Sequence, residues 1–210
     1  MKHRTIHIVI VFGMLMLSNI VFGQVVIIDP GHGGIDSGAV GSHQQKLEKD
    51  IVLAIAKAMI EQNRMDETSG LEMYLTRYTD TLIALKNRTR LAKALKPMLF
   101  LSLHCNNTTH EDANGVEVYA YSKSGRFKAD AVYWGYVLEK QLTQFKNLES
   151  RGVKFENFHV LRNLVNDTPS VLLELGFLSN PEDETYLSSK KGIHQIALKI
   201  NQTINSNLKK

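Results

Sequence analysis

The chain contains, at residues 25–34, the stretch VVIIDPGHGG, in which an apolar run is followed at once by a glycine-rich turn. Short continuous apolar runs are typical of strands that are covered on both faces of a parallel sheet. Glycines after such a strand let the backbone turn tightly and approach a ligand closely. The stretch therefore predicts a buried strand whose carboxyl end carries Asp29 and His32 to the edge of a sheet.

Two other apolar runs have the same form, at residues 98–103 and 171–173. Segments with helical spacing of apolar residues alternate with these runs, which is typical of an α/β fold. We predict a three-layer sandwich, with a mostly parallel twisted sheet and helices on both of its faces. The expected helices are 47–59, 82–95, 127–145 and 192–208, and the expected further strands are 71–76, 115–121 and 157–161.

The composition fits one globular unit, because 43% of the 210 residues are hydrophobic and 22% are charged. It excludes disordered and collagen-like chains, and a single Cys excludes a disulfide scaffold. The net charge of +4 falls to +2 without Lys2 and Arg4, which is too mild to predict nucleic-acid binding. No linker or repeat divides residues 24–210, so we expect one catalytic domain there.

Residues 1–23 have the form of a signal peptide. A short basic start precedes an apolar run at 6–17, which is too short to span a bilayer alone. We predict cleavage before Gln24, with no stable membrane insertion afterwards; the alternative is an uncleaved N-terminal anchor. The mature chain is then exported, and periplasmic or associated with the cell wall.

The candidate functional residues follow the apolar runs, because ligands in such sheets bind beyond the carboxyl ends of the strands. His32, His104 and Glu174 occupy these positions. A carboxylate such as Glu174, at the end of a buried strand, needs a metal, a proton or a substrate nearby. Glu48 begins the apolar stripe of the first helix and is expected to point to the same edge. The alternative is that Glu48 is a solvated residue that only interacts favourably with the helix dipole.

Two imidazoles and one carboxylate with an open fourth position form a catalytic zinc site. The group His32, Glu48 and His104 fits that pattern, and Glu174 would then take a proton from water and pass it to the leaving nitrogen. Cys105 neighbours His104 on a strand, so its side chain is expected on the opposite face, as a small buried hydrophobe. His43 and His110 are kept as weaker candidate ligands, because they lie near the proposed ligands in the sequence.

Seven stretches, in order and at compatible spacing, resemble the zinc-dependent N-acetylmuramoyl-L-alanine amidases of the Amidase_3 family. They are residues 26–34, 47–50, 75–77, 101–106, 115–118, 151–153 and 174–180. The resemblance implies one Zn²⁺ per chain, held by His32, Glu48 and His104, with Glu174 as the catalytic carboxylate. It also implies hydrolysis of the amide between N-acetylmuramic acid and L-alanine, with peptidoglycan or a muropeptide as the substrate.

Other roles stay open at this stage. Asp29 either orients His32 or braces the turn, and Asn106 is a candidate substrate contact. One of three arginines is expected to meet a carboxylate of the stem peptide, and the candidates are Arg77, Arg88 and Arg151. The short stretch after His104 leaves no room for the inserted helix that covers the site in some relatives, so we expect an open site. A protein activator or targeting partner is compatible with the absence of a wall-binding repeat.

Two alternatives from other classes remain. One is a catalytically idle relative that binds muropeptides or regulates another amidase. The other is a zinc peptidase or deacetylase that uses the same residues on another amide of the cell wall. The identity of the product separates these enzymes.

Overall fold

The computed structural model describes residues 24–145 and 148–208 of the chain. The predicted signal peptide, residues 1–23, lies outside the described residues. Six strands form one sheet in the order β2-β1-β3-β6-β4-β5. They are β1 (Gln24–Pro30), β2 (Leu71–Leu75), β3 (Leu99–Asn106), β4 (Val116–Tyr121), β5 (Ser150–Glu156) and β6 (Ser170–Phe177). Among the described residues, no helix is both long and apolar enough to cross a bilayer.

The sheet is mostly parallel, as predicted. Strands β2, β1, β3 and β6 pair in parallel, and so do β4 and β5. The pairing of β4 with β6 is antiparallel, with Glu117 opposite Glu174. The carboxyl ends of β1, β3 and β6 therefore meet at one edge, to which the antiparallel pairing also brings the first residues of β4.

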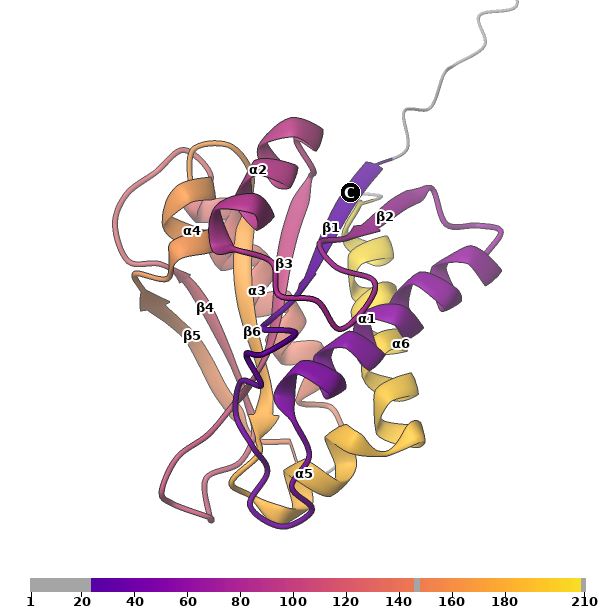
Figure 1. The fold of residues 1–210 in the computed structure, drawn as a ribbon. Helices are drawn as coiled ribbons and strands as arrows, with labels where there is room; N and C mark the ends of the chain where they lie inside the picture. Colours follow the sequence, from indigo (N-terminus) through magenta and orange to yellow (C-terminus); the bar gives the residue numbers. More distant parts are fainter. Residues whose placement is uncertain (1–23, 146–147, 209–210) are drawn as a thin grey trace, which may run out of the picture.

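Helices cover both faces of the sheet (Figure 1), which confirms the predicted three-layer architecture. The larger core lies under α1 (Glu48–Met65), α3 (Lys128–Leu142) and α6 (Lys190–Leu208). The smaller core lies under the short helices α2 (Leu85–Leu95) and α4 (His159–Leu164). These two helices leave part of their face of the sheet uncovered, where strand residues line a cleft.

Alternate strand residues enter the two cores. In β3, Leu101 and Leu103 belong to the larger core, whereas Phe100 belongs to the smaller one. The same alternation sends His104 to the side of α2 and α4, and Cys105 to the larger core, where it is 3% exposed. The prediction that Cys105 does not share a face with His104 is confirmed.

The predicted strand at 157–161 is wrong. The strand in this part of the chain is β5, which comes earlier, at Ser150–Glu156. Helix α4 begins at His159. Val160, Leu161 and Leu164 bury one helical face in the smaller core, so these apolar residues follow helical spacing. Strand β5 lies at the edge of the sheet and is half-exposed, and it therefore lacks the apolar run that marks the central strands.

Two further differences affect the site. Strands β3 and β6 continue to Asn106 and Phe177, so His104 and Glu174 lie within their strands rather than just after them. Helix α5 (Pro181–Ser188) was not predicted, although Pro181 follows an N-cap residue, Asn180, whose side chain accepts two main-chain N–H groups. The remaining helices differ from the expected ranges only at their ends.

Candidate metal centre and cleft

A row of polar side chains crosses the sheet on the face of α2 and α4. His104 of β3 is in register with Glu174 of β6, and Glu174 is opposite Glu117 of β4. Residues in register on neighbouring strands project from the same face. Asp29 of β1 is likewise in register with Ser102 of β3, and the Ser102 hydroxyl donates to the Asp29 carboxylate over 2.8 Å.

The turn after β1 brings His32 to this row. His32 has a φ of 56°, in the left-handed region that residues with a β-carbon seldom occupy. Gly31 lies directly against His104: a Cβ added at Gly31 would stand 2.3 Å from Cε1 of that imidazole. Only glycine lets the backbone come this close, so the turn sets how the two histidines lie relative to each other.

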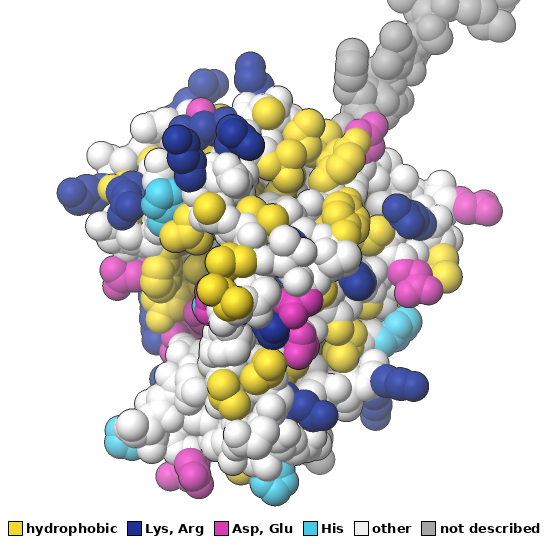
Figure 2. Space-filling model, in the orientation of Figure 1, with side chains coloured by type: hydrophobic (Ala, Val, Ile, Leu, Met, Phe, Trp, Pro, Cys, Tyr) yellow, Lys and Arg dark blue, Asp and Glu magenta, His cyan; other side chains and the backbone are white. Residues whose placement is uncertain are grey.

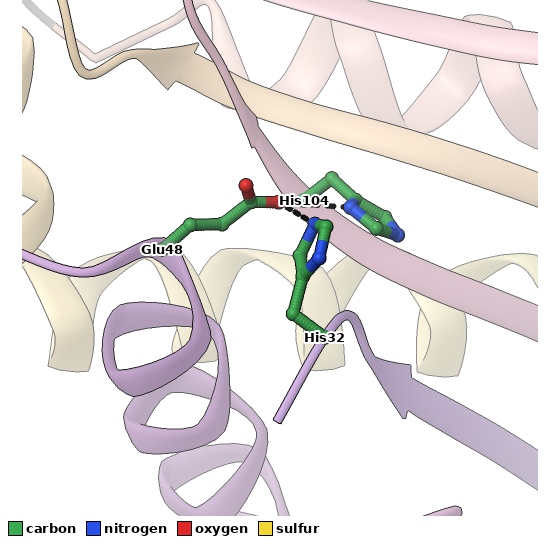
Figure 3. Close-up of side chains that lie close together, drawn as sticks. All are labelled: His32, Glu48 and His104. Carbon is green, nitrogen blue, oxygen red and sulfur yellow. Dashed lines mark hydrogen bonds and ion pairs between the residues drawn. The ribbon is translucent and has the colours of Figure 1, made fainter. Parts of the chain in front are cut away.

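Helix α1 supplies the third donor. Glu48 is its first residue, and its carboxylate points to both imidazoles (Figure 3). Oε1 of Glu48 lies 2.8 Å from Nδ1 of His104 and 3.0 Å from Nε2 of His32. Oε2 accepts the main-chain N–H of Ala39 over 2.7 Å. One nitrogen of each histidine and one oxygen of Glu48 all lie within 4.8 Å of one another, which makes this group able to hold a metal ion.

The charges of these three groups depend on one another. Burial raises the pKa of Glu48, but hydrogen bonds from His104 and His32 outweigh it and bring the pKa to about 2. Burial lowers the pKa of His32, but Glu48 and Asp36 raise it to about 9. The carboxylates of Glu48 and Asp36 thus favour positive charge at His32, and the same negative potential favours a cation at this position.

The carboxyl group of Glu174 is buried beside the candidate metal ligands. Its Oε2 is buried and has no hydrogen bond within the described part of the chain. Burial is the largest influence on this carboxyl group, and the neighbouring Glu48 and Glu117 act in the same direction; together they raise its pKa to about 7 despite His104. A carboxyl group with a pKa near neutrality can both accept and give up a proton in water near pH 7.

A cleft of about 670 Å³ opens over this row. Its floor includes His104 and Glu174, and its walls come from the start of α2 and from α4. Leu82 and Leu85 remain 48% and 51% exposed at its rim, and hydrophobic side chains are visible on this face in Figure 2. The side chains of His32 and His104 are 24% and 19% exposed to solvent, so solvent reaches the candidate metal position.

The two aspartates near His32 have separate tasks. Asp29 accepts from Thr76, Arg88 and Ser102 and so braces the turn; no bond joins it to His32 in the described structure. Asp36 lies 2.9 Å from Nδ1 of His32 and fixes that ring instead. Asp36 was not among the predicted site residues. Its place four residues after His32 in a tight turn is the signal that could have found it.

The three candidate arginines differ in their surroundings. Arg77 and Arg88 are each 3% exposed, and each donates two of its four hydrogen bonds to main-chain carbonyls of residues 30–32. Arg151 has a 34% exposed side chain, donates to Glu117 over 2.7 Å and covers the ring of Phe177. Asn106 also donates to Glu117, over 3.0 Å.

Buried Glu117 thus organises the polar row beside Glu174. Besides Arg151 and Asn106, it accepts from Lys154 over 2.6 Å and from the Tyr119 hydroxyl over 2.7 Å. Burial raises the pKa of Glu117, but these donors lower it below its ordinary value. Glu117 and Glu174 are opposite each other, and in the described part of the chain Arg151 and Lys154 form ion pairs with Glu117 but not with Glu174. Their environments therefore move their pKa values in opposite directions. Glu117 was missing from the predicted site residues, although its segment carried part of the resemblance.

Comparison with known proteins gives consistent matches. The family model described as N-acetylmuramoyl-L-alanine amidase matches residues 26–206. The "Probable cell wall amidase LytH" of Staphylococcus aureus is 38% identical over 169 residues, covering 80% of this chain and 53% of the relative. The chain therefore spans about half the length of the curated relatives that it matches.

Solved structures of the same class superpose well on this chain. The catalytic domain of CwlV, an N-acetylmuramoyl-L-alanine amidase from Bacillus (Paenibacillus) polymyxa var. colistinus, has a TM-score of 0.78 at 35% identity, covering 89% of this chain and 98% of that one. The CwlD amidase from Clostridioides difficile, solved in complex with the GerS lipoprotein, has a TM-score of 0.78 at 27% identity, with coverages of 89% and 98%.

Proposed function

Because the chain belongs to the N-acetylmuramoyl-L-alanine amidase family, we propose that it hydrolyses the amide bond between N-acetylmuramic acid and L-alanine in peptidoglycan. The observation that carries the proposal is the meeting of three donors, His32, Glu48 and His104, close to the buried carboxyl group of Glu174. Both histidines and Glu174 line the cleft. These residues come from four separate elements, and their arrangement suits hydrolysis of an amide.

We propose zinc as the cofactor, one ion per chain. Two imidazole nitrogens and one carboxylate oxygen are the donors that catalytic zinc sites use, and the solvent-accessible side leaves room for a further ligand. His32 would bind through Nε2, His104 through Nδ1 and Glu48 through its carboxylate. The chemistry that zinc supplies in such a site is polarisation of a carbonyl oxygen and acidification of water.

The residues of the chain divide the remaining work. The Asp36 carboxylate accepts a hydrogen bond from Nδ1 of His32. The lone pair of Nε2 on the same ring is then available to bind the metal ion. Glu174 takes a proton from water at Oε2 and gives it to the leaving nitrogen of the amide. The apolar rim, with Leu82 and Leu85, limits access of bulk water around the bound amide.

We propose Arg151 and Asn106 as substrate contacts. Glu117 fixes both side chains, and Arg151 keeps part of its surface open to solvent on the same face of the sheet. An arginine held in this way suits a carboxylate of the stem peptide.

We further propose that the chain is exported and has a protein partner. Residues 1–23 have the composition of a signal peptide, and the mature chain would act in the periplasm or at the cell wall, where the substrate lies. The complex of the CwlD amidase with a lipoprotein supports an activator or targeting partner for this chain as well.

The test is mass spectrometry of the products formed from purified peptidoglycan and from a soluble muramyl peptide by residues 24–210. We expect free stem peptides that begin with L-alanine, lost after chelation and restored by zinc. Cleavage at another bond would contradict the proposed substrate while leaving the metal site in place. Binding without cleavage in the presence of zinc would favour either a catalytically idle relative or a missing activator. Adding a cell extract that contains the envelope fraction tests whether an activator is missing.

A further inference from the structure

Two arginines are buried beneath the turn that carries His32. Arg77 lies two residues after the end of β2, and Arg88 lies in α2. Together they donate hydrogen bonds to three consecutive main-chain carbonyl groups, those of Pro30, Gly31 and His32. A guanidinium group has a rigid fork of donors, so each bond also fixes the direction of the carbonyl that accepts it.

Arg77 joins the two segments that carry candidate ligands. One of its terminal nitrogens, Nη2, donates to the carbonyl of Gly31 over 2.8 Å and to the carbonyl of Lys49 over 2.8 Å. Gly31 precedes His32, and Lys49 follows Glu48. One nitrogen therefore ties together the main-chain neighbours of two candidate ligands from different elements.

Arg88 holds the ligand-bearing residue itself. Its Nη2 donates to the carbonyl of His32 over 2.7 Å, and its Nη1 donates to Pro30 over 2.7 Å and to Asp29 over 2.8 Å. His32 has a backbone conformation with positive φ, which persists only where surrounding contacts impose it. The bond from Arg88 to the His32 carbonyl is such a contact.

These bonds leave the two arginines little capacity for a substrate. Each makes four hydrogen bonds to protein oxygens, and each is 3% exposed. Burying two neighbouring cations is costly, and burial together with Arg88 lowers the pKa of Arg77. Asp29 is the carboxylate that touches this pair in the described structure, through Arg88.

We propose that Arg77 and Arg88 are positioning residues, which hold His32 and Glu48 at the separation that a metal ion requires. This inference rests on the proposed metal site. It assigns the two arginines to metal affinity and geometry, and it leaves recognition of the stem peptide to other side chains.

The experiment compares Arg77→Lys and Arg88→Lys with wild type and with Arg90→Lys, a control on the exposed face of α2. Lysine keeps the charge but lacks the fork of donors. Zinc affinity is measured by competition with a chromophoric chelator, and geometry by the visible spectrum of the cobalt-loaded protein. We expect zinc affinity to fall about 10- to 100-fold in both variants, with an altered cobalt spectrum and with Arg90→Lys unchanged.

Kinetics with a soluble muramyl peptide at saturating zinc separate the two roles. A positioning role lowers kcat and leaves KM within about twofold. Unchanged zinc affinity together with a raised KM would overturn the inference, because it would make the arginines substrate contacts.

Two further outcomes are decisive. If a lysine variant fails to give a cooperative thermal transition, Asp29→Asn is measured in its place, since it removes the carboxylate that orients Arg88; unchanged zinc affinity in that variant contradicts the inference. If wild type itself binds no zinc, the proposed metal site has failed. Tight binding by wild type with equal binding by the variants means that only the positioning role has failed.

Discussion

The close approach of Gly31 to His104 gives the sharpest prediction. A methyl group at this position would stand 2.3 Å from Cε1 of the imidazole, whereas ordinary contact begins at 3.4 Å. In Gly31→Ala, the ring or the turn must therefore move by about 1.1 Å. The backbone of Gly31 is not among those with positive φ, so alanine suits the local conformation and the clash with His104 is the main effect.

The displacement is large compared with the tolerance of a metal site, which is about 0.5 Å. We expect kcat/KM to fall at least about 100-fold, equivalent to about 2.7 kcal/mol of transition-state stabilisation. Zinc affinity should fall as well, and the protein should remain folded. The measurements are product release from a soluble muramyl peptide, competition titration with zinc and thermal unfolding.

Gly70→Ala is the matched control, because a Cβ at Gly70 meets nothing within 4 Å. It should leave activity and zinc affinity unchanged. If Gly31→Ala kept activity and zinc affinity within threefold of wild type, the turn would not set the position of His104, and the reasoning would be refuted.

Three other changes test separate parts of the structure. Glu174→Gln should lower kcat about 100- to 10,000-fold while one zinc ion per chain stays bound; wild-type kcat would exclude Glu174 as the proton carrier. Asp36→Ala frees Nδ1 of His32 and should weaken zinc binding about tenfold in a competition titration, and unchanged affinity would contradict the orienting role. Leu161→Ala opens a cavity beneath α4 and should cost about 2–5 kcal/mol in urea unfolding, since Leu161 is 0% exposed; a loss below 1 kcal/mol would mean that the smaller core contributes little.

The central part of the fold could be predicted because its signals are local. The runs at 98–103 and 171–173 are apolar apart from Ser102, so each marks a buried parallel strand without knowledge of its neighbours. Strand β5 gave no such signal, because an edge strand buries less and its residues are half-exposed. The residues of α4 were assigned to a strand for the related reason that a short apolar segment suits either structure.

The donors of the candidate metal centre were also open to prediction from sequence. Each follows or begins an element that could be recognised: His32 lies in the glycine turn, Glu48 starts a helix and His104 ends an apolar run. Parallel strands bring their carboxyl ends to one edge, so the order of elements already implies that these side chains converge. The structure brings them together within hydrogen-bonding distance.

What the sequence alone determined, then, is the kind of sheet, the elements that carry the candidate ligands and the chemical type of those ligands. The tertiary structure alone decided which distant side chains form hydrogen bonds around these ligands. Arg77 meets Gly31 across 46 positions of the chain, and Arg88 meets Asp29 across 59. Propensity and spacing act over a few residues, whereas a buried hydrogen bond depends on which distant segments fold against each other. The hydrogen-bond partners of these arginines, open in the sequence, therefore follow from the packing of α2 and of the segment after β2 beneath the turn.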